Sequence, residues 1–510
     1  IYCSNFKLIF LCLYNALLAV KSIEVETTTG TVRGKSNEYG ILCYYSYEGI
    51  PFAEPPIGKL RFRPPVPIKP WTGVLDACAP GPVCPQTEYF YPRSEMNEDC
   101  LYLNIYVPVT ESVDPLPVVF FVHGGYYTTG SGSPTPIYGP QRILQNGVIV
   151  VTTNYRLGAL GFLAFDDVDA TGNAGLKDIL LASKWVKSNI AKFGGNPNQI
   201  CIFGTGSGGI LAHYLLLTEK SDGIFKTAII CSGSAISYRA LQIDPKENAL
   251  KLAQQLGIKY DDNRCLNELK EIDAFDIVDA EDYIIRNDPR RGFIFIHFFA
   301  PTIEKPSSNA IITRNPLDII RTEGLVQKIP IITGFNNQEG LEIFVALKDD
   351  PQIVDKLNEN FELCIPPDIQ YPPESQQRRD LANNIREFYF GCGNISIYNT
   401  QNYINLITDT AYTYSIDYWI KLYKSQRLSS LVYYYVFQFD GQLNWGKLFA
   451  DITYPGVCRG DELGYVFVTN VTENKLENLN RKSQYVIIVN SHNCSKLIND
   501  VIRQSKYLLF

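Results

Sequence analysis

The chain has 510 residues, of which 45% are hydrophobic and 19% charged, and its formal net charge is −7. This composition is typical of a globular protein with a large core. A mildly acidic chain is not expected to bind nucleic acid or an anionic membrane surface.

The amino-terminal residues 1–22 are typical of a secretory signal peptide. Lys7 precedes a mostly apolar run over residues 8–20, and Val20 and Ser22 suit the small-residue positions of a cleavage site. The alternative interpretation is a buried helix. Because the chain begins with Ile1 and not with Met, we expect its amino end to be incomplete. No later segment reaches about 18 consecutive apolar residues, so we predict no transmembrane anchor and a secreted protein.

Apolar runs typical of buried strands alternate with helical patterns through the rest of the chain. Strands are predicted at residues 118–122, 148–153, 199–203, 227–231, 329–333 and 431–439. Apolar residues at three- and four-residue spacing predict helices at residues 175–193 and 210–217. This alternation predicts an α/β fold with a large, mostly parallel sheet flanked by helices. No repeat or clean linker interrupts it, so we expect one domain over residues 23–467 and a divergent or truncated tail over residues 468–510.

Three stretches resemble the type-B carboxylesterases, the cholinesterase-like family of the α/β-hydrolase fold. Residues 98–108, Glu-Asp-Cys-Leu-Tyr-Leu-Asn-Ile-Tyr-Val-Pro, match the family's cysteine-loop signature. Residues 49–53, Gly-Ile-Pro-Phe-Ala, resemble its amino-terminal block, and residues 193–197, Phe-Gly-Gly-Asn-Pro, open the segment that leads to its nucleophile. The resemblance runs from about residue 25 to residue 467 and implies the α/β-hydrolase fold.

The family hydrolyses esters with a Ser-His-Glu triad, and its serine lies on a turn of pattern Gly-x-Ser-x-Gly. Here residues 204–208 read Gly-Thr-Gly-Ser-Gly, which puts Gly206 at the nucleophile position. Ser207 falls one place later and is the alternative nucleophile if the turn has slid by one residue. That register would place the β-branched Thr205 where the turn needs a small residue, so we favour Gly206.

The acid of the triad is present and its base is not. Residues 335–340, Phe-Asn-Asn-Gln-Glu-Gly, resemble the acid block and imply that Glu339 is the third member; the alternative is a surface-loop glutamate. Residues 456–463 resemble the histidine block, but Arg459 stands at the histidine position. Arginine is always protonated and cannot take a proton from serine. Four histidines occur, and none is expected to replace the lost base: His123, His213, His297 and His492.

The oxyanion hole is also altered. The resemblance implies that the backbone N–H groups of Gly125, Tyr126 and Ser207 are its donors. Family members usually have a third glycine or a small residue where this chain has Tyr126, so we expect the tyrosine side chain to narrow the site. We also predict an ion pair between Arg459 and Glu339, because the family places these two positions in contact and either charge alone would be costly to bury.

The remaining features concern the surface and the loops. The resemblance implies a disulfide between Cys84 and Cys100. Three sequons are plausible glycosylation sites in a secreted chain, at Asn394, Asn470 and Asn493. No motif indicates a cofactor or a metal site.

Three functions remain open at this point. The first is a secreted, catalytically inactive esterase-like protein that binds or sequesters a small hydrophobic ligand or a protein partner. The family includes catalytically silent adhesion proteins such as neuroligins and neurotactin, which are usually membrane-anchored. The second is a carboxylic-ester hydrolase that uses Ser207 with a non-standard base. The third is a non-functional fragment of a decaying gene.

Overall fold

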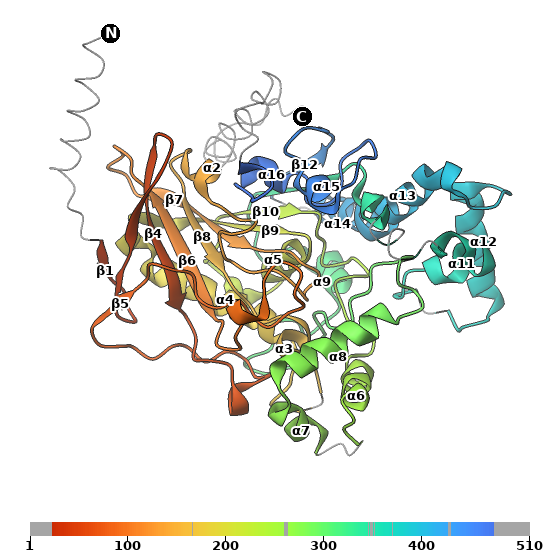
Figure 1. The fold of residues 1–510 in the computed structure, drawn as a ribbon, viewed down its shortest axis with the longest axis horizontal. Helices are drawn as coiled ribbons and strands as arrows, with labels where there is room; N and C mark the ends of the chain where they lie inside the picture. The colour runs from red at the N-terminus through yellow and green to blue at the C-terminus, as the bar shows by residue number, and fades with distance from the viewer. Residues whose placement is uncertain are drawn as a thin grey trace, which may run out of the picture.

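The computed structural model describes residues 23–473 apart from 166, 260–263, 345, 347–349, 351, 370 and 427–429. The predicted signal peptide, most of the predicted tail, His492 and Asn493 therefore lie outside the described residues. Among those described, nine strands form one large sheet and three form a small sheet of order β1-β2-β5. Figure 1 places the small sheet at the opposite end of the molecule from helices α11 and α12.

The large sheet has the order β12-β11-β10-β9-β7-β8-β6-β4-β3. Neighbouring strands from β12 to β8 are parallel, and those from β8 to β3 are antiparallel. The strands of the two sheets are β1 (Glu24–Glu26), β2 (Thr31–Arg33), β3 (Lys35–Tyr39), β4 (Leu42–Pro51), β5 (Val74–Asp76), β6 (Tyr102–Pro108), β7 (Leu116–Val122), β8 (Ile149–Thr153), β9 (Gly195–Thr205), β10 (Thr227–Cys231), β11 (Ile331–Asn336) and β12 (Val432–Phe437).

Helices cover this sheet and, at one end, extend the molecule beyond it (Figure 1). They are α2 (Gln141–Leu144), α3 (Gly158–Phe162), α4 (Ala174–Asn189), α5 (Ser207–Leu216), α6 (Pro245–Gln255), α7 (Cys265–Glu271), α8 (Ala274–Arg286), α9 (Pro316–Thr322), α11 (Ile353–Glu359), α12 (Gln376–Phe390), α13 (Thr400–Thr408), α14 (Tyr414–Lys424), α15 (Trp445–Ala450) and α16 (Leu463–Val466). All ten residues of α5 are buried, because this helix packs against β7, β9 and β10. The predicted α/β-hydrolase fold, a mostly parallel sheet flanked by helices, is confirmed.

The sequence pattern located the central strands because they are buried on both faces. Every residue from 118 to 122 in β7 is at most 2% exposed, as expected of a parallel strand covered by helices on each side. The predicted strands at 118–122, 148–153 and 227–231 lie within one or two residues of β7, β8 and β10. The predicted strand at 199–203 is longer in the structure, because β9 runs over Gly195–Thr205.

The chain order reverses between β7 and β9. From β7 the chain runs outward to β8, then returns to the other side of β7 as β9 and continues outward through β10, β11 and β12. In open α/β sheets a ligand site lies outside the carboxyl ends of the strands at such a reversal. The segments that follow β7, β9 and β11 begin at His123, Gly206 and Asn337. Because these strands are parallel, the three stretches that resemble the family's motifs leave the same edge of the sheet.

Candidate active site

A sharp turn centred on Gly206 joins β9 to α5. Gly206 has φ +55° and ψ −122°, a conformation that residues with a Cβ adopt only at a cost. Its N–H donates to the Cys231 carbonyl at 2.8 Å, and its carbonyl accepts from the Ile210 N–H at 3.0 Å. Close packing of the turn requires a glycine at Gly208, where a Cβ would lie 2.3 Å from the Val122 carbonyl oxygen. The turn has the shape of a nucleophile elbow, with no side chain at position 206.

Glu339 is fully buried after the end of β11. Its Oε1 accepts from the Ser232 hydroxyl at 2.5 Å and from the Asn336 N–H at 2.8 Å. Its Oε2 has no hydrogen-bond partner among the described residues. Burial raises the pKa of Glu339 to about 8, and the nearby Glu462 contributes to the rise. The neutral carboxyl therefore predominates near pH 7.

Arg459 forms its ion pair with Glu342, so the predicted pair with Glu339 is wrong. Nη1 of Arg459 lies 3.1 Å from Oε1 of Glu342. The two glutamates are three residues apart on the 3₁₀ helix η5 (Glu339–Glu342), and the Glu342 side chain is 25% exposed. Glu339 is completely buried, and burial favours its neutral form, so it is the weaker partner for a cation. The arginine side chain instead reaches Glu342, which is less deeply buried.

Tyr126 lies between the oxyanion loop and Arg459. Its ring packs against the guanidinium group, whose Cζ is 3.9 Å from the ring centroid. Its hydroxyl donates to Oε1 of Glu342, which therefore accepts from both Tyr126 and Arg459. Tyr126 has φ +59°, which is the region that favours glycine. The N–H groups of Gly125, Tyr126 and Ser207 donate to no acceptor in the described part of the chain.

The Ser207 hydroxyl is 3% exposed, and its oxygen accepts from the Tyr127 N–H at 3.3 Å. No histidine in the described ranges makes a hydrogen bond to it. Burial lowers the pKa of His123 to about 4 and the pKa values of His213 and His297 to about 3. Their Nδ1 atoms are already bonded to backbone groups. None of the described histidines is therefore placed to act as a base for Ser207.

The sequence did not predict three side chains near this site: Glu342, Tyr412 and Arg239. Tyr412 lies on the π-helical segment η8 (Asp409–Thr413), is fully buried, and has a hydroxyl without a partner among the described residues. Cζ of Arg239 is 3.9 Å from the centroid of the Tyr412 ring. Of these three residues, only Glu342 has a signal in the sequence. It lies three residues after Glu339, and residues three apart on a 3₁₀ helix share a face.

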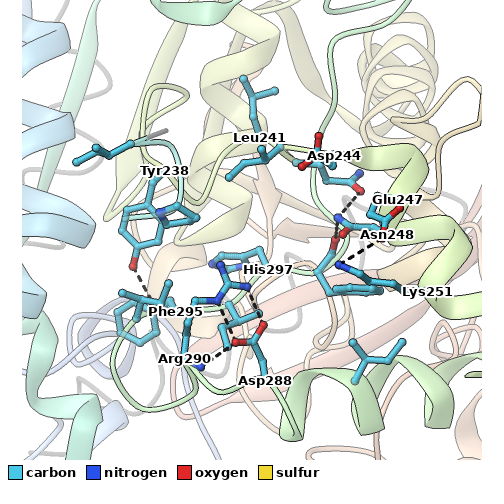
Figure 2. Close-up of a pocket in the computed structure, with 18 of the residues that line it drawn as sticks. Tyr238, Leu241, Asp244, Glu247, Asn248, Lys251, Asp288, Arg290, Phe295 and His297 are labelled. Carbon is cyan, nitrogen blue, oxygen red and sulfur yellow. Dashed lines mark hydrogen bonds and ion pairs between the residues drawn. The ribbon is translucent and has the colours of Figure 1, made fainter. Parts of the chain in front are cut away.

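A pocket of about 290 Å³ adjoins the site. Tyr126 and Glu342 form one side of it, and its other walls are mostly apolar side chains that include Phe293, Phe295 and Ile407. A larger cleft of about 940 Å³ lies on the other side of residues 294–296, which line both spaces. Figure 2 shows this cleft.

The larger cleft is polar, and four of its charged side chains pair within it. Nη2 of Arg290 lies 2.7 Å from Oδ2 of Asp288, and Lys251 lies 3.7 Å from Glu247. Neither Tyr126 nor Glu342 lines this cleft, whereas both line the smaller pocket. The smaller pocket is therefore the one that adjoins the Arg459 contacts, and the larger cleft is separate from them.

The predicted disulfide between Cys84 and Cys100 is confirmed, with an S–S distance of 2.08 Å. Asn394 and Asn470 are exposed, as a glycan would require. No helix in the described ranges is long and apolar enough to cross a membrane. Within the same ranges, no group of three or more His, Cys, Asp or Glu side chains is placed to hold a metal ion.

The sheet order, the reversal between β7 and β9 and the turn at Gly206 define an α/β-hydrolase. A sequence profile of the carboxylesterase family matches residues 21–491. Venom carboxylesterase-6 of Apis mellifera is 33% identical over 465 residues, which are 88% of this chain and 82% of that protein. Juvenile hormone esterase of Tribolium castaneum is 33% identical over 493 residues, which are 92% of this chain and 81% of that protein.

A solved structure shows the same architecture. The crystal structure of juvenile hormone esterase from Manduca sexta, with OTFP covalently attached, is similar with a TM-score of 0.83 and 29% identity. The match covers 93% of this chain and 90% of that chain. The chain belongs to the carboxylesterase family.

Proposed function

We propose that this protein binds a small apolar molecule beside its altered elbow and does not hydrolyse esters. One observation carries the proposal. Position 206 has no side chain, and the guanidinium group of Arg459 faces the space that a side chain would enter. An ideal Cβ on Gly206 would lie 3.1 Å from Nη2 and 3.5 Å from Nε of Arg459.

The expected loss of rate supports this proposal. Removing the serine or the histidine from a comparable triad costs about 10⁶ in turnover. The oxyanion hole and binding alone leave an acceleration of about 10³ to 10⁴ over water. Because the two residues act as a unit, losing both is little worse than losing one. A protein with Gly206 and Arg459 is therefore expected to be far too slow for a useful esterase.

The pocket of about 290 Å³ is our candidate for the binding site. Ligand sites are concave and mostly apolar, with a few polar groups that orient the ligand. Phe293, Phe295 and Ile407 supply apolar walls, while Tyr126 and Glu342 supply polar groups next to the elbow. Two relatives are named juvenile hormone esterases, so juvenile hormone is one ligand to test. Protein partners stay an alternative class.

We also propose that the protein is secreted and glycosylated. The Cys84–Cys100 disulfide supports this, because such bonds persist in oxidising compartments. The exposed sequons at Asn394 and Asn470 are compatible with it. Expression in insect cells should yield a folded glycoprotein in the medium, and retention of an aggregated chain inside the cells would favour a non-functional fragment instead.

A fluorophosphonate probe tests the absence of catalysis, because it labels only an activated serine. We expect no labelling of the purified protein and no turnover of short-chain nitrophenyl esters above buffer. Labelling that maps to Ser207, together with organophosphate-sensitive turnover, would establish the hydrolase alternative. The Ser207→Ala variant is the matched control, since it removes the serine hydroxyl of the elbow.

A further inference from the structure

Several hydrogen-bond donors near the elbow have no acceptor among the described residues, and Oε2 of Glu339 and Oε2 of Glu342 have no donor there. Arg459 uses Nη1 to contact Glu342. Its other edge, made by Nε and Nη2, donates to no described residue and faces Gly206. This edge of a guanidinium group binds a carboxylate through two parallel hydrogen bonds.

Three backbone donors face the same turn. The N–H groups of Gly125, Tyr126 and Ser207 have no acceptor among the described residues. Ser207 is the first residue of α5, a helix of ten residues, so the positive end of the helix dipole adds to these donors. In an active esterase such donors bind the oxyanion that forms on the substrate. Here no nucleophile can create that oxyanion, so the donors suit a ligand that is already anionic.

The Tyr412 hydroxyl is a further unpaired donor, and its position is independent of the elbow. The residue is fully buried, and its hydroxyl has no described partner. Burial raises the pKa of Tyr412, while Arg239 and Arg459 oppose the rise, so the hydroxyl keeps its proton near neutral pH. Tyr412 packs against Phe295, with 5.9 Å between the ring centroids, and Phe295 in turn packs against Tyr126 with 5.8 Å between theirs.

One buried cation beside Tyr412 has no carboxylate partner. Cζ of Arg239 lies 3.9 Å from the centroid of the Tyr412 ring, and the residue is 3% exposed and forms no ion pair in the described part of the chain. An uncompensated buried charge is costly, and an anionic ligand would offset it.

We propose that the altered elbow is a carboxylate-binding site, in which Arg459, the Tyr412 hydroxyl and the oxyanion-loop N–H groups hold the head of an aliphatic acid. This inference rests on the proposed function, because the tail of the acid occupies the adjoining apolar pocket. Tyr126 and Glu342 line the pocket and also contact Arg459, so the pocket borders the donor cluster. A planar carboxylate matches the flat guanidinium edge, and an ester or an alcohol has no charge to pair with it.

Isothermal titration calorimetry on the whole secreted chain tests this inference. Decanoate, methyl decanoate and decanol share one apolar tail and differ in their heads. We expect decanoate to bind at least about tenfold more tightly than the two neutral probes, because a charge-assisted pair contributes more than a neutral one. Arg459→Gln should remove this preference and leave the affinity for methyl decanoate unchanged. Arg290→Gln, in the separate cleft, is the matched control and should change neither.

The Glu342→Gln variant should change the decanoate affinity in the opposite direction. This test does not depend on the folding of the Arg459→Gln variant. Removing the competing carboxylate frees Arg459, so decanoate should bind several-fold more tightly to this variant. Equal binding of decanoate and methyl decanoate would overturn the carboxylate site and leave the apolar-ligand function standing. Failure of all three probes to bind would overturn both proposals. Decanoate binding that Arg459→Gln and Glu342→Gln leave unchanged would place the acid elsewhere.

Discussion

A side chain at position 206 should destabilise the fold, and Gly206→Ala measures this without adding a hydroxyl. At φ +55° and ψ −122° a residue with a Cβ is strained by about 1–3 kcal/mol. The new methyl group would also lie 3.1 Å from Nη2 of Arg459. That contact adds little, because the guanidinium group ends a flexible side chain and can move away. We therefore expect a loss of about 1–3 kcal/mol in the free energy of unfolding.

The expected change in melting temperature is small but measurable. Unfolding entropy is about 2.1 cal/mol/K per residue, so 510 residues give about 1 kcal/mol/K, and each 1 kcal/mol lowers the melting temperature by about 1 °C. Differential scanning fluorimetry of Gly206→Ala should show a drop of about 1–3 °C. Gly40→Ala is a useful comparison, because Gly40 also has a positive φ of +59° and a Cβ there would meet no atom within 4 Å.

One result would refute this reasoning. If Gly206→Ala melts at or above the temperature of the parent protein, the backbone at residue 206 is not strained. The elbow register would then be wrong, and Ser207 would again be the candidate nucleophile. If Gly206→Ala loses stability only when Arg459 is intact, the contact with the guanidinium group dominates over backbone strain, and an Arg459→Ala background distinguishes the two causes.

Three further outcomes are expected. The Gly206→Ser variant alone should not turn over nitrophenyl esters, because Arg459 cannot accept a proton. The double variant Gly206→Ser with Arg459→His should be labelled by the fluorophosphonate probe. Equal labelling of the single variant would contradict the role given to Arg459. Burial raises the pKa of Glu339 from an ordinary 4.5 to about 8, so the parent protein loses stability as the pH rises between these values. The melting temperature of Glu339→Gln should therefore rise relative to that of the parent across this pH range. A constant difference between the two melting temperatures would show that Glu339 is ionised in the fold. Breaking the Cys84–Cys100 bond with Cys84→Ser should cost about 3 kcal/mol for a loop of this length, whereas two free thiols in non-reducing peptide maps of the parent would refute the bond.

The sheet and the elbow could be predicted because local patterns determine them. Apolar runs such as residues 118–122 belong to strands buried on both faces, and the glycines at Gly204 and Gly208 follow from the close packing of the turn. The same patterns identified the triad positions by resemblance. They contained no information on how far each side chain reaches or how deeply it is buried.

The ion pair of Arg459 shows what the sequence could not determine. The choice between Glu339 and Glu342 depends on how deeply each carboxyl group is buried and on which of them the arginine side chain reaches, and both follow from the packed structure. Tyr412 was missed for a similar reason. It lies in a helical region far along the chain, and only the tertiary fold packs it against Phe295 and Arg239. Residues that act from distant elements leave no spacing signal in one sequence.

The sharing of Oε1 of Glu342 between Tyr126 and Arg459 has a consequence for how this site can change. Replacing Glu342 removes the acceptor of both donors, whereas replacing Tyr126 or Arg459 leaves Oε1 with one donor, so the effects of single and combined substitutions should not add. A return to an active esterase through Gly206→Ser and Arg459→His would therefore also change the surroundings of Glu342, which would lose its cation and keep the Tyr126 hydroxyl as its donor.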